Sequence, residues 1–200
     1  MDILGHLSTI NHHRYEVMKN CFRAGLYWQG LTHDLSKYAP VEFIPGAIYF
    51  QGNRSPNNAE REATGVSRAW LHHKGRNRHH YEYWTDYSPT AKKGQLVGAL
   101  MPRKYIAEMF CDRVAASKIY NKENYNDSFP LAYLVQGIDS LLMHEKTRND
   151  IVFLLNMLKE KGEDYTFEFI KRKYLKGVKL PKMDIEKIKA QNPIPEIMSK

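Results

Sequence analysis

Apolar residues recur at helical spacing near the start of the chain, and they predict an amphipathic helix from about Gly5 to Trp28. His13 lies three residues after one member of this apolar face and four residues before the next, so it should face inward. His12 falls instead among the polar positions of the same helix. A packed core histidine is the structural alternative for His13. The apolar face comprises Leu7, Ile10, Val17 and Cys21.

The middle of the chain alternates turn formers with helical patterns. Pro40 suits the start of a short helix, and residues 51–58 read as a loop. From about Ala59 the helical period resumes, and a helix continuing through Gly75 would place His73 and His80 inward. His72 and His79 would then lie about 100° away from that face. Because Gly75 weakens the helix, His72 stays open as an inward residue. The expected face comprises Val66, Ala69, His73, Asn77, His80 and Trp84.

The C-terminal half also has the helical period. Pro102 fits the first turn of a helix that carries Asp112 on its apolar face. A carboxylate facing inward needs a cation, a metal ion or several hydrogen-bond donors. A salt bridge to an arginine is the structural alternative. A last helical region is expected over residues 129–158, with Thr147 as its cap and Asp150 three positions later. His144, which has no partner at ligand spacing, is expected to be structural.

The length and composition fit one all-α domain. The chain has 200 residues and 42% hydrophobic content, enough for a single substantial core. We expect a helical metal-binding domain over residues 1–175 and a basic C-terminal tail over 176–200. Cys21 and Cys111 form no disulfide framework, and neither a signal peptide nor an apolar run of membrane length is evident. A cytoplasmic protein without a membrane span is therefore expected.

The net charge is +8, which suits an anionic partner such as a nucleotide, a sugar phosphate or a nucleic acid. Charge does not choose among these partners, and it leaves the oligomeric state open. The function has to be inferred from particular residues and their spacing.

The adjacent pair His33 and Asp34 carries the most chemical information in the chain. Further imidazoles precede and follow it, and Asp112 comes later. Nitrogen and carboxylate ligands without a thiolate cluster suit a divalent transition metal, namely Mn, Fe, Co, Ni or Zn. A metal-centred enzyme with one or two ions is the first hypothesis.

The order of these residues resembles the HD-domain metal-dependent phosphohydrolase superfamily over about residues 5–120. The family's motifs match His13, then the dipeptide in His33-Asp34-Leu35-Ser36-Lys37, then Asp112 in Cys-Asp-Arg-Val-Ala-Ala-Ser-Lys. The chain is also similar to a small bacterial group of HD-like proteins of unknown function. The resemblance implies a helical bundle of HD-domain type, and the ligands it implies, together with the inward His80, are His13, His33, Asp34, His72, His73, His80 and Asp112.

Such a site predicts a metal-dependent phosphohydrolase that acts on a nucleotide or another small phosphoester through a metal-activated water. Asp34 and Lys37 are the expected catalytic residues. The basic residues expected to bind the substrate are Arg14, Lys37, Arg76 and Arg78.

Two other interpretations stay open. The inositol oxygenase group has a similar ligand order and uses two irons, so a di-iron oxygenase is one alternative. A non-catalytic module that binds nucleic acid is the other, although the sequence has no phosphate loop, RNA-binding aromatic signature or zinc-finger spacing to favour it.

Overall fold

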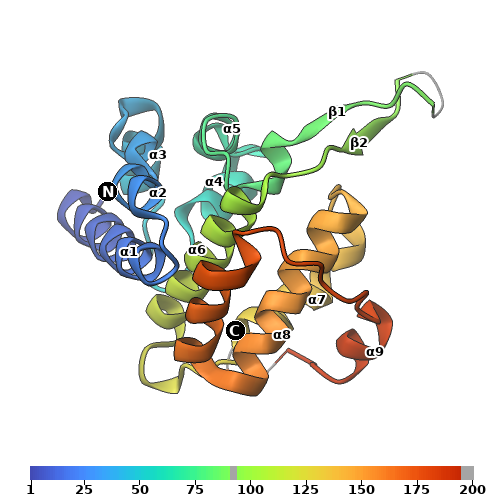
Figure 1. The fold of residues 1–200 in the computed structure, drawn as a ribbon. Helices are drawn as coiled ribbons and strands as arrows, with labels where there is room; N and C mark the ends of the chain where they lie inside the picture. Colours follow the sequence, from blue (N-terminus) through green and yellow to red (C-terminus); the bar gives the residue numbers. More distant parts are fainter. Residues whose placement is uncertain (91–93, 195–200) are drawn as a thin grey trace.

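A computed structural model describes residues 1–90 and 94–194. Within these residues the chain forms nine α-helices and one small antiparallel sheet, so the expected all-α class is confirmed (Figure 1). The helices are α1 Ile3–Arg23, α2 Tyr27–Thr32, α3 Pro40–Ile48, α4 Pro56–Thr64, α5 Arg68–Lys74, α6 Arg103–Asn121, α7 Phe129–Gly137, α8 Glu145–Phe169 and α9 Ile185–Ala190. The strands are β1 Thr85–Tyr87 and β2 Leu96–Gly98.

Helix α1 follows the sequence pattern but ends earlier than expected. Its N-cap is Asp2, whose side chain accepts a hydrogen bond from the Gly5 amide at 2.8 Å. The helix ends at Arg23, and the next turn needs Gly25, which has a φ of +79°. The chain then turns into the separate helix α2, which carries Trp28. The buried apolar residues of α1 are Ile10, Val17 and Cys21.

The prediction of one helix that continues through Gly75 is wrong, because the helix is interrupted after Thr64 and again after Lys74. Gly65, with a φ of +80°, ends α4, and Ser67 caps α5 by accepting from the Trp70 amide at 3.0 Å. Helix α5 already ends at Lys74. Turns and a short 3-10 segment follow, so the residues from 76 onward do not keep the helical phase of α5.

A β-hairpin that the sequence pattern did not predict follows these turns. Strands β1 and β2 pair antiparallel, with Thr85 opposite Gly98, and Figure 1 shows the hairpin extending away from the helices. A side chain at Gly98 would collide with the backbone of Met143 and His144, so this strand needs glycine to pass so close.

Helix α6 lies near the middle of the molecule and packs against α7 and α8 (Figure 1). It begins at Arg103, directly after Pro102, as the sequence predicted. On its core side Phe110 is fully buried and meets Phe167 edge-on at 5.6 Å between ring centroids. Burying an aromatic side chain of this kind stabilises the fold by roughly 1.5–3 kcal/mol. Helix α6 also packs against α1, where Asp112 lies close to His13.

The last helical region consists of the two helices α7 and α8. The prediction that Thr147 caps a helix there is wrong. The His144 side chain caps α8 by accepting from the Lys146 amide at 3.0 Å. Thr147 is buried and instead accepts a hydrogen bond from the Met101 amide at 3.2 Å. His144 is therefore structural, as expected.

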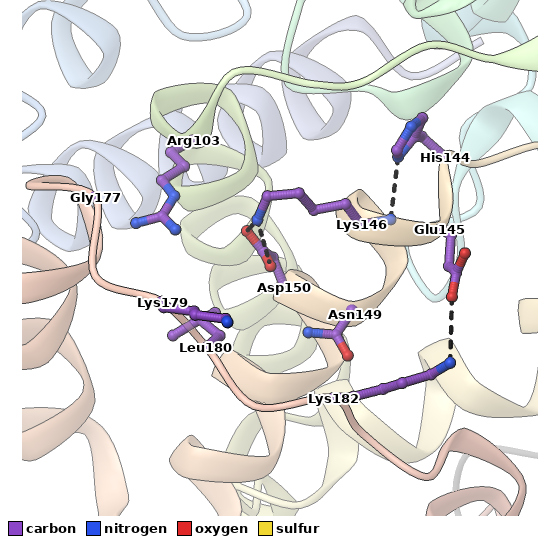
Figure 2. A pocket seen from close by; sticks show the side chains of 10 residues that line it. All are labelled: Arg103, His144, Glu145, Lys146, Asn149, Asp150, Gly177, Lys179, Leu180 and Lys182. Carbon is purple, nitrogen blue, oxygen red and sulfur yellow. Dashed lines mark hydrogen bonds and ion pairs between the residues drawn. The ribbon is translucent and has the colours of Figure 1, made fainter.

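The segment expected as a basic tail packs against the body as far as Asn192, whose carbonyl accepts a hydrogen bond from Gln136. A hollow of about 520 Å³ lies between this segment and the starts of α6 and α8 (Figure 2). Arg103 donates to the carbonyls of Tyr174 and Val178 at 2.7 and 2.6 Å, and Asn149 donates to the carbonyl of Pro181 at 3.0 Å. Ile188 of α9 is buried in the core. Residues 195–200 of the expected tail lie outside the described residues. Along the described chain, no helix combines the length and apolar character needed to cross a membrane.

Candidate metal centre

The His33-Asp34 dipeptide occupies a tight turn between α2 and the 3-10 segment Leu35–Tyr38. Asp34 has a φ of +53°, a left-handed conformation that is uncommon for residues other than glycine. Arg14 of α1 holds the turn, because its Nε donates to the carbonyl of His33 at 2.8 Å and its Nη2 to that of Leu31 at 3.2 Å. Both side chains of the dipeptide are buried. Backbone strain of this kind persists where the surroundings fix it, often at a functional site.

The first group of ligand atoms joins this turn to α1 and α6. His13 Nε2 lies 3.0 Å from Asp112 Oδ1 and 3.7 Å from Asp34 Oδ2. His33 Nε2 lies 3.3 Å from Asp34 Oδ2 and 3.7 Å from Asp112 Oδ1. Two atoms that ligate one ion at ~2.1 Å in tetrahedral or octahedral geometry lie about 3 to 3.5 Å apart. The four residues that the sequence singled out first are thus spaced to share one ion.

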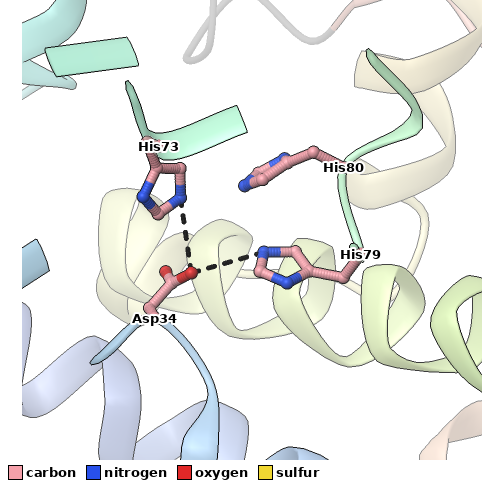
Figure 3. Close-up of side chains that lie close together, drawn as sticks. All are labelled: Asp34, His73, His79 and His80. Carbon is pink, nitrogen blue, oxygen red and sulfur yellow. Dashed lines mark ion pairs between the residues drawn. The ribbon is translucent and has the colours of Figure 1, made fainter. Parts of the chain in front are cut away.

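The second group lies on the other side of Asp34. Figure 3 shows His73, His79 and His80 arranged around the Asp34 carboxylate. The Nε2 atoms of His73 and His79 lie 3.3 and 3.4 Å from Asp34 Oδ1. His80 belongs to the same group. The adjacent residues His79 and His80 can both face Asp34 because this part of the chain is a turn and not a helix.

Asp34 is common to both groups and uses a different oxygen in each. Oδ2 faces His13 and His33, and Oδ1 faces His73 and His79. A carboxylate placed in this way can bridge two ions. Asp34 thus connects the two groups of candidate ligand atoms.

Two buried glutamates support the imidazoles from behind. Glu108 of α6 has its Oε1 3.0 Å from His33 Nδ1 and 3.3 Å from His79 Nδ1. Glu42 of α3 has its Oε2 2.8 Å from His73 Nδ1. Carboxylates at Nδ1 orient imidazoles whose Nε2 atoms bind metal. The contacts of Glu108 and Glu42 at Nδ1 leave the Nε2 atoms of His33, His79 and His73 directed towards Asp34.

Several candidate ligand atoms are suited to a metal because they have no hydrogen-bond partner in the part of the chain that the structure describes. Among the described residues, five buried atoms of the two groups make no hydrogen bond although they lie close together. Burying polar atoms without partners costs free energy that a bound cation would offset. They are His13 Nε2, His33 Nε2, Asp34 Oδ1, His79 Nε2 and His80 Nε2.

The charges of the site also favour a cation. Burial opposes ionisation of Asp34, but the charges of His33, Lys37 and His73 hold the pKa of its carboxyl well below the ordinary value. Burial likewise opposes ionisation of Asp112, and here the neighbouring imidazoles of His13 and His33 keep the pKa well below its usual range. Both carboxylates are thus negatively charged.

The imidazoles differ in protonation. Burial lowers the pKa of His33, yet Asp34 and the other nearby carboxylates outweigh burial and raise that pKa well above its ordinary value. Burial, with the charge of His79, pushes the pKa of His80 well below the ordinary value. Burial and the charge of Lys37 lower the pKa of His13. In the metal-free protein the neighbouring carboxylates therefore favour the doubly protonated form of His33, whereas burial favours the neutral forms of His13 and His80, which can bind a metal.

A cavity of about 770 Å³ opens onto both groups, with walls from α1, α5, α6 and the loop before α4. This volume lies in the range of small-molecule sites. Lys37 lines the cavity, and its Nζ lies 2.7 Å from Asp34 Oδ2. Arg54 and Lys118 also line it but pair with Glu62 and Glu163. Lys122 lines the cavity as well, but Lys37 is the lysine that forms an ion pair with a candidate ligand.

Several residues that the sequence predicted for the site lie outside the ligand groups and the cavity. His72 lies outside both groups and pairs with Glu42, with 2.5 Å between Nδ1 and Oε1, so the inward residue of the pair is His73. Arg14 fixes the turn backbone, as described above. Arg76 is exposed, and Arg78 donates to the hydroxyl of Tyr105 at 3.1 Å. None of these three arginines is among the described residues that line the cavity.

Three residues of the centre were not expected from the sequence. His79 was expected about 100° away from the inward face, and it lies against Asp34 only because the helix ends at Lys74. Glu108 lies one helical turn before Asp112, so its spacing could have signalled a shared inward face. Glu42 carried no such signal, because its role depends on how α3 packs against α5.

The fold and site together define a helical protein with buried His/Asp/Glu clusters that could hold a metal ion. A family model described as a family of unknown function (DUF5662) matches residues 2–157, and the chain belongs to this family. The matched range contains every candidate ligand. No curated protein and no solved structure matches the chain.

Proposed function

We propose that this protein is a metal-dependent phosphohydrolase of HD-domain type that acts on a small phosphoester. One observation carries the proposal: two groups of candidate ligand atoms share Asp34, which lines a cavity together with Lys37. The order of His13, His33, Asp34 and Asp112 along the chain resembles that superfamily and supports the same assignment.

The residues present fit two divalent ions. His13, His33, Asp34 and Asp112 would hold one ion, and Asp34 with His73, His79 and His80 would hold the other. When bound, such ions lower the pKa of water towards neutrality and polarise a phosphoryl oxygen.

The protein's own groups supply orientation and charge. Asp34 is fixed by its turn and by Lys37, so its two oxygens keep their directions. The Lys37 ammonium is partly exposed to the cavity, where it can neutralise a phosphoryl oxygen without losing contact with Asp34.

Reconstitution of the metal-free protein tests the proposal. The chain is loaded with Mn, Co, Ni, Mg or Fe, bound ions are counted by mass spectrometry, and phosphate release is measured with nucleotides, phosphomonoesters and phosphodiesters. We expect two ions per chain and release that depends on the metal. Asp112→Asn should abolish release, whereas the exposed Arg76→Ala should retain it.

Two other outcomes would contradict the proposal. Oxygen consumption by the iron-loaded protein, without phosphate release under any metal, would assign it to di-iron oxygenases. Tight nucleic-acid binding with no hydrolysis would assign it to binding modules.

A further inference from the structure

Glu108 occupies a position between the two groups of ligand atoms. It lies on α6 one turn before Asp112 and is almost completely buried, with 6% of its surface exposed. A single oxygen, Oε1, lies 3.0 Å from His33 Nδ1 and 3.3 Å from His79 Nδ1. The rings of these two histidines pack against each other, with 4.3 Å between their centroids.

The two histidines belong to different groups. His33 directs its Nε2 towards Asp34 Oδ2 and Asp112, and His79 directs its Nε2 towards Asp34 Oδ1. An ionised carboxylate only accepts hydrogen bonds, so each imidazole contacting Glu108 carries its proton on Nδ1. Nε2 is then the atom of each ring that can bind an ion, which at His33 replaces the second proton.

We propose that Glu108 is a positioning residue that couples the two candidate metal sites, because one of its oxygens orients a ligand of each. The inference rests on the two-ion centre of the proposed function, but not on any particular reaction. In this role Glu108 would bind neither ion of the two groups and would act through His33 and His79.

Glu42 provides a matched comparison within the same chain. It is also buried and also contacts two imidazoles, but only His73 belongs to a ligand group. Removing Glu42 should therefore affect the site of His73, His79 and His80 alone. Glu60 is a control for the loss of a buried carboxylate away from the centre, because it binds Ser67 and the amide of Arg68.

The experiment titrates Co²⁺ into metal-free wild-type protein and four variants: Glu108→Ala, Glu108→Gln, Glu42→Ala and Glu60→Gln. Bound ions are counted after dialysis, and the visible absorption reports the coordination of Co²⁺. Loss of an outer carboxylate typically weakens metal binding about 10- to 100-fold. We expect Glu108→Ala to weaken both sites by this factor, Glu42→Ala to weaken one, and Glu60→Gln to weaken neither.

Glu108→Gln separates positioning from general destabilisation. An amide oxygen at the place of Oε1 can still accept from both imidazoles, so this variant should recover most of the lost affinity. Nitrogen NMR of the Zn²⁺-loaded protein gives a second measurement. In the wild type, His33 and His79 should carry protons on Nδ1, and Glu108→Ala should change the signals of these two rings while that of His73 stays unchanged.

Each outcome decides the inference. If Glu108→Ala binds two ions as tightly as the wild type, or loses only one site as Glu42→Ala does, the coupling role is wrong. If the wild type binds no ion, both the centre and the coupling are wrong. If it binds two ions that depend on Glu108 but hydrolyses no phosphoester, the coupling stands and only the proposed reaction fails.

Discussion

Asp112 Oδ1 lies 3.0 Å from His13 Nε2, although 98 residues separate the two in the chain. The contact joins the middle of α1 to the middle of α6, two helices that pack closely. Each residue falls on the inward face of its own amphipathic helix, which is why the pattern of apolar positions identified both. When two such helices pack, their inward polar residues meet, and here they meet beside the His33-Asp34 turn.

The first prediction follows from the orientation of α1, which turns His13 inward and leaves His12 exposed. His13→Ala should remove one ion from the two-ion centre, because it deletes a ligand of the first group, while His12→Ala should retain both. His12 is exposed and belongs to neither ligand group. Metal content after dialysis gives the comparison. Equal metal content in the two variants would show that His13 is a packed histidine and not a ligand.

The second prediction concerns Asp34, which is shared by both groups. Asp34→Asn should lose most of both ions and all metal-dependent activity, since the amide lacks the charge needed to bridge two cations. The helical circular dichroism should remain. Asp34→Ala should in addition be less stable than Asp34→Asn by about 1 kcal/mol, because alanine tolerates the left-handed conformation less well than asparagine. Full occupancy of both sites in either variant would contradict the bridging role.

The third prediction concerns protons. In the metal-free protein the pKa of His33 is raised well above 6.5, so the protonated ring stabilises the fold below pH 6.5 and this contribution is lost as the pH rises through the raised pKa. A metal at Nε2 displaces the proton. Zn²⁺ binding at pH 7 should therefore release at least one proton, and the rise in Tm on metal binding should be larger at pH 8 than at pH 6.

Calorimetry in two buffers of different ionisation enthalpy measures the proton release. Asp34 and Asp112 should contribute none, because the charges around them, which outweigh burial, already hold both pKa values well below the ordinary range. A metal-induced rise in Tm that is the same at both pH values, with no proton released, would contradict this assignment of His33.

The helical periodicity of the sequence predicted the ligand residues on α1 and α6 more accurately than those on and after α5. His13 and Asp112 lie on long helices, where the period of 3.6 residues fixes the direction of a side chain. His73, His79 and His80 lie on a seven-residue helix and the turns after it, so extending the helical period through Gly75 gave His79 the wrong direction. In irregular backbone, spacing along the chain does not determine where a side chain points.

The outer carboxylates were harder to predict for a different reason. Glutamate is typical of exposed helical positions, and tertiary packing buries Glu42 and Glu108 against imidazoles. Only Glu108, one helical turn before Asp112, had a spacing that indicated an inward face. The β-hairpin was missed because its strands have only three residues each, too few to set up an alternating pattern.

The last prediction concerns Lys37, whose Nζ lies 2.7 Å from Asp34 Oδ2 at the cavity. Lys37→Met removes a positive charge that faces the reacting phosphoryl group in the proposed function, so kcat should fall by about 100-fold, the scale seen when one charge-stabilising donor is lost. Metal binding should be unchanged or tighter, because the ammonium repels cations. Lys37→Arg should restore part of the rate.

Salt dependence separates a small substrate from a polyanion in the same variants. For a small phosphoester, KM should change only modestly between 50 and ~200 mM salt, whereas binding of a nucleic acid loses orders of magnitude over that range because counterions are released. Wild-type turnover should thus be nearly insensitive to salt, and Lys37→Met should change kcat more than KM. A steep salt dependence of KM that disappears in Lys37→Met would instead place this lysine on a surface that binds a polyanion.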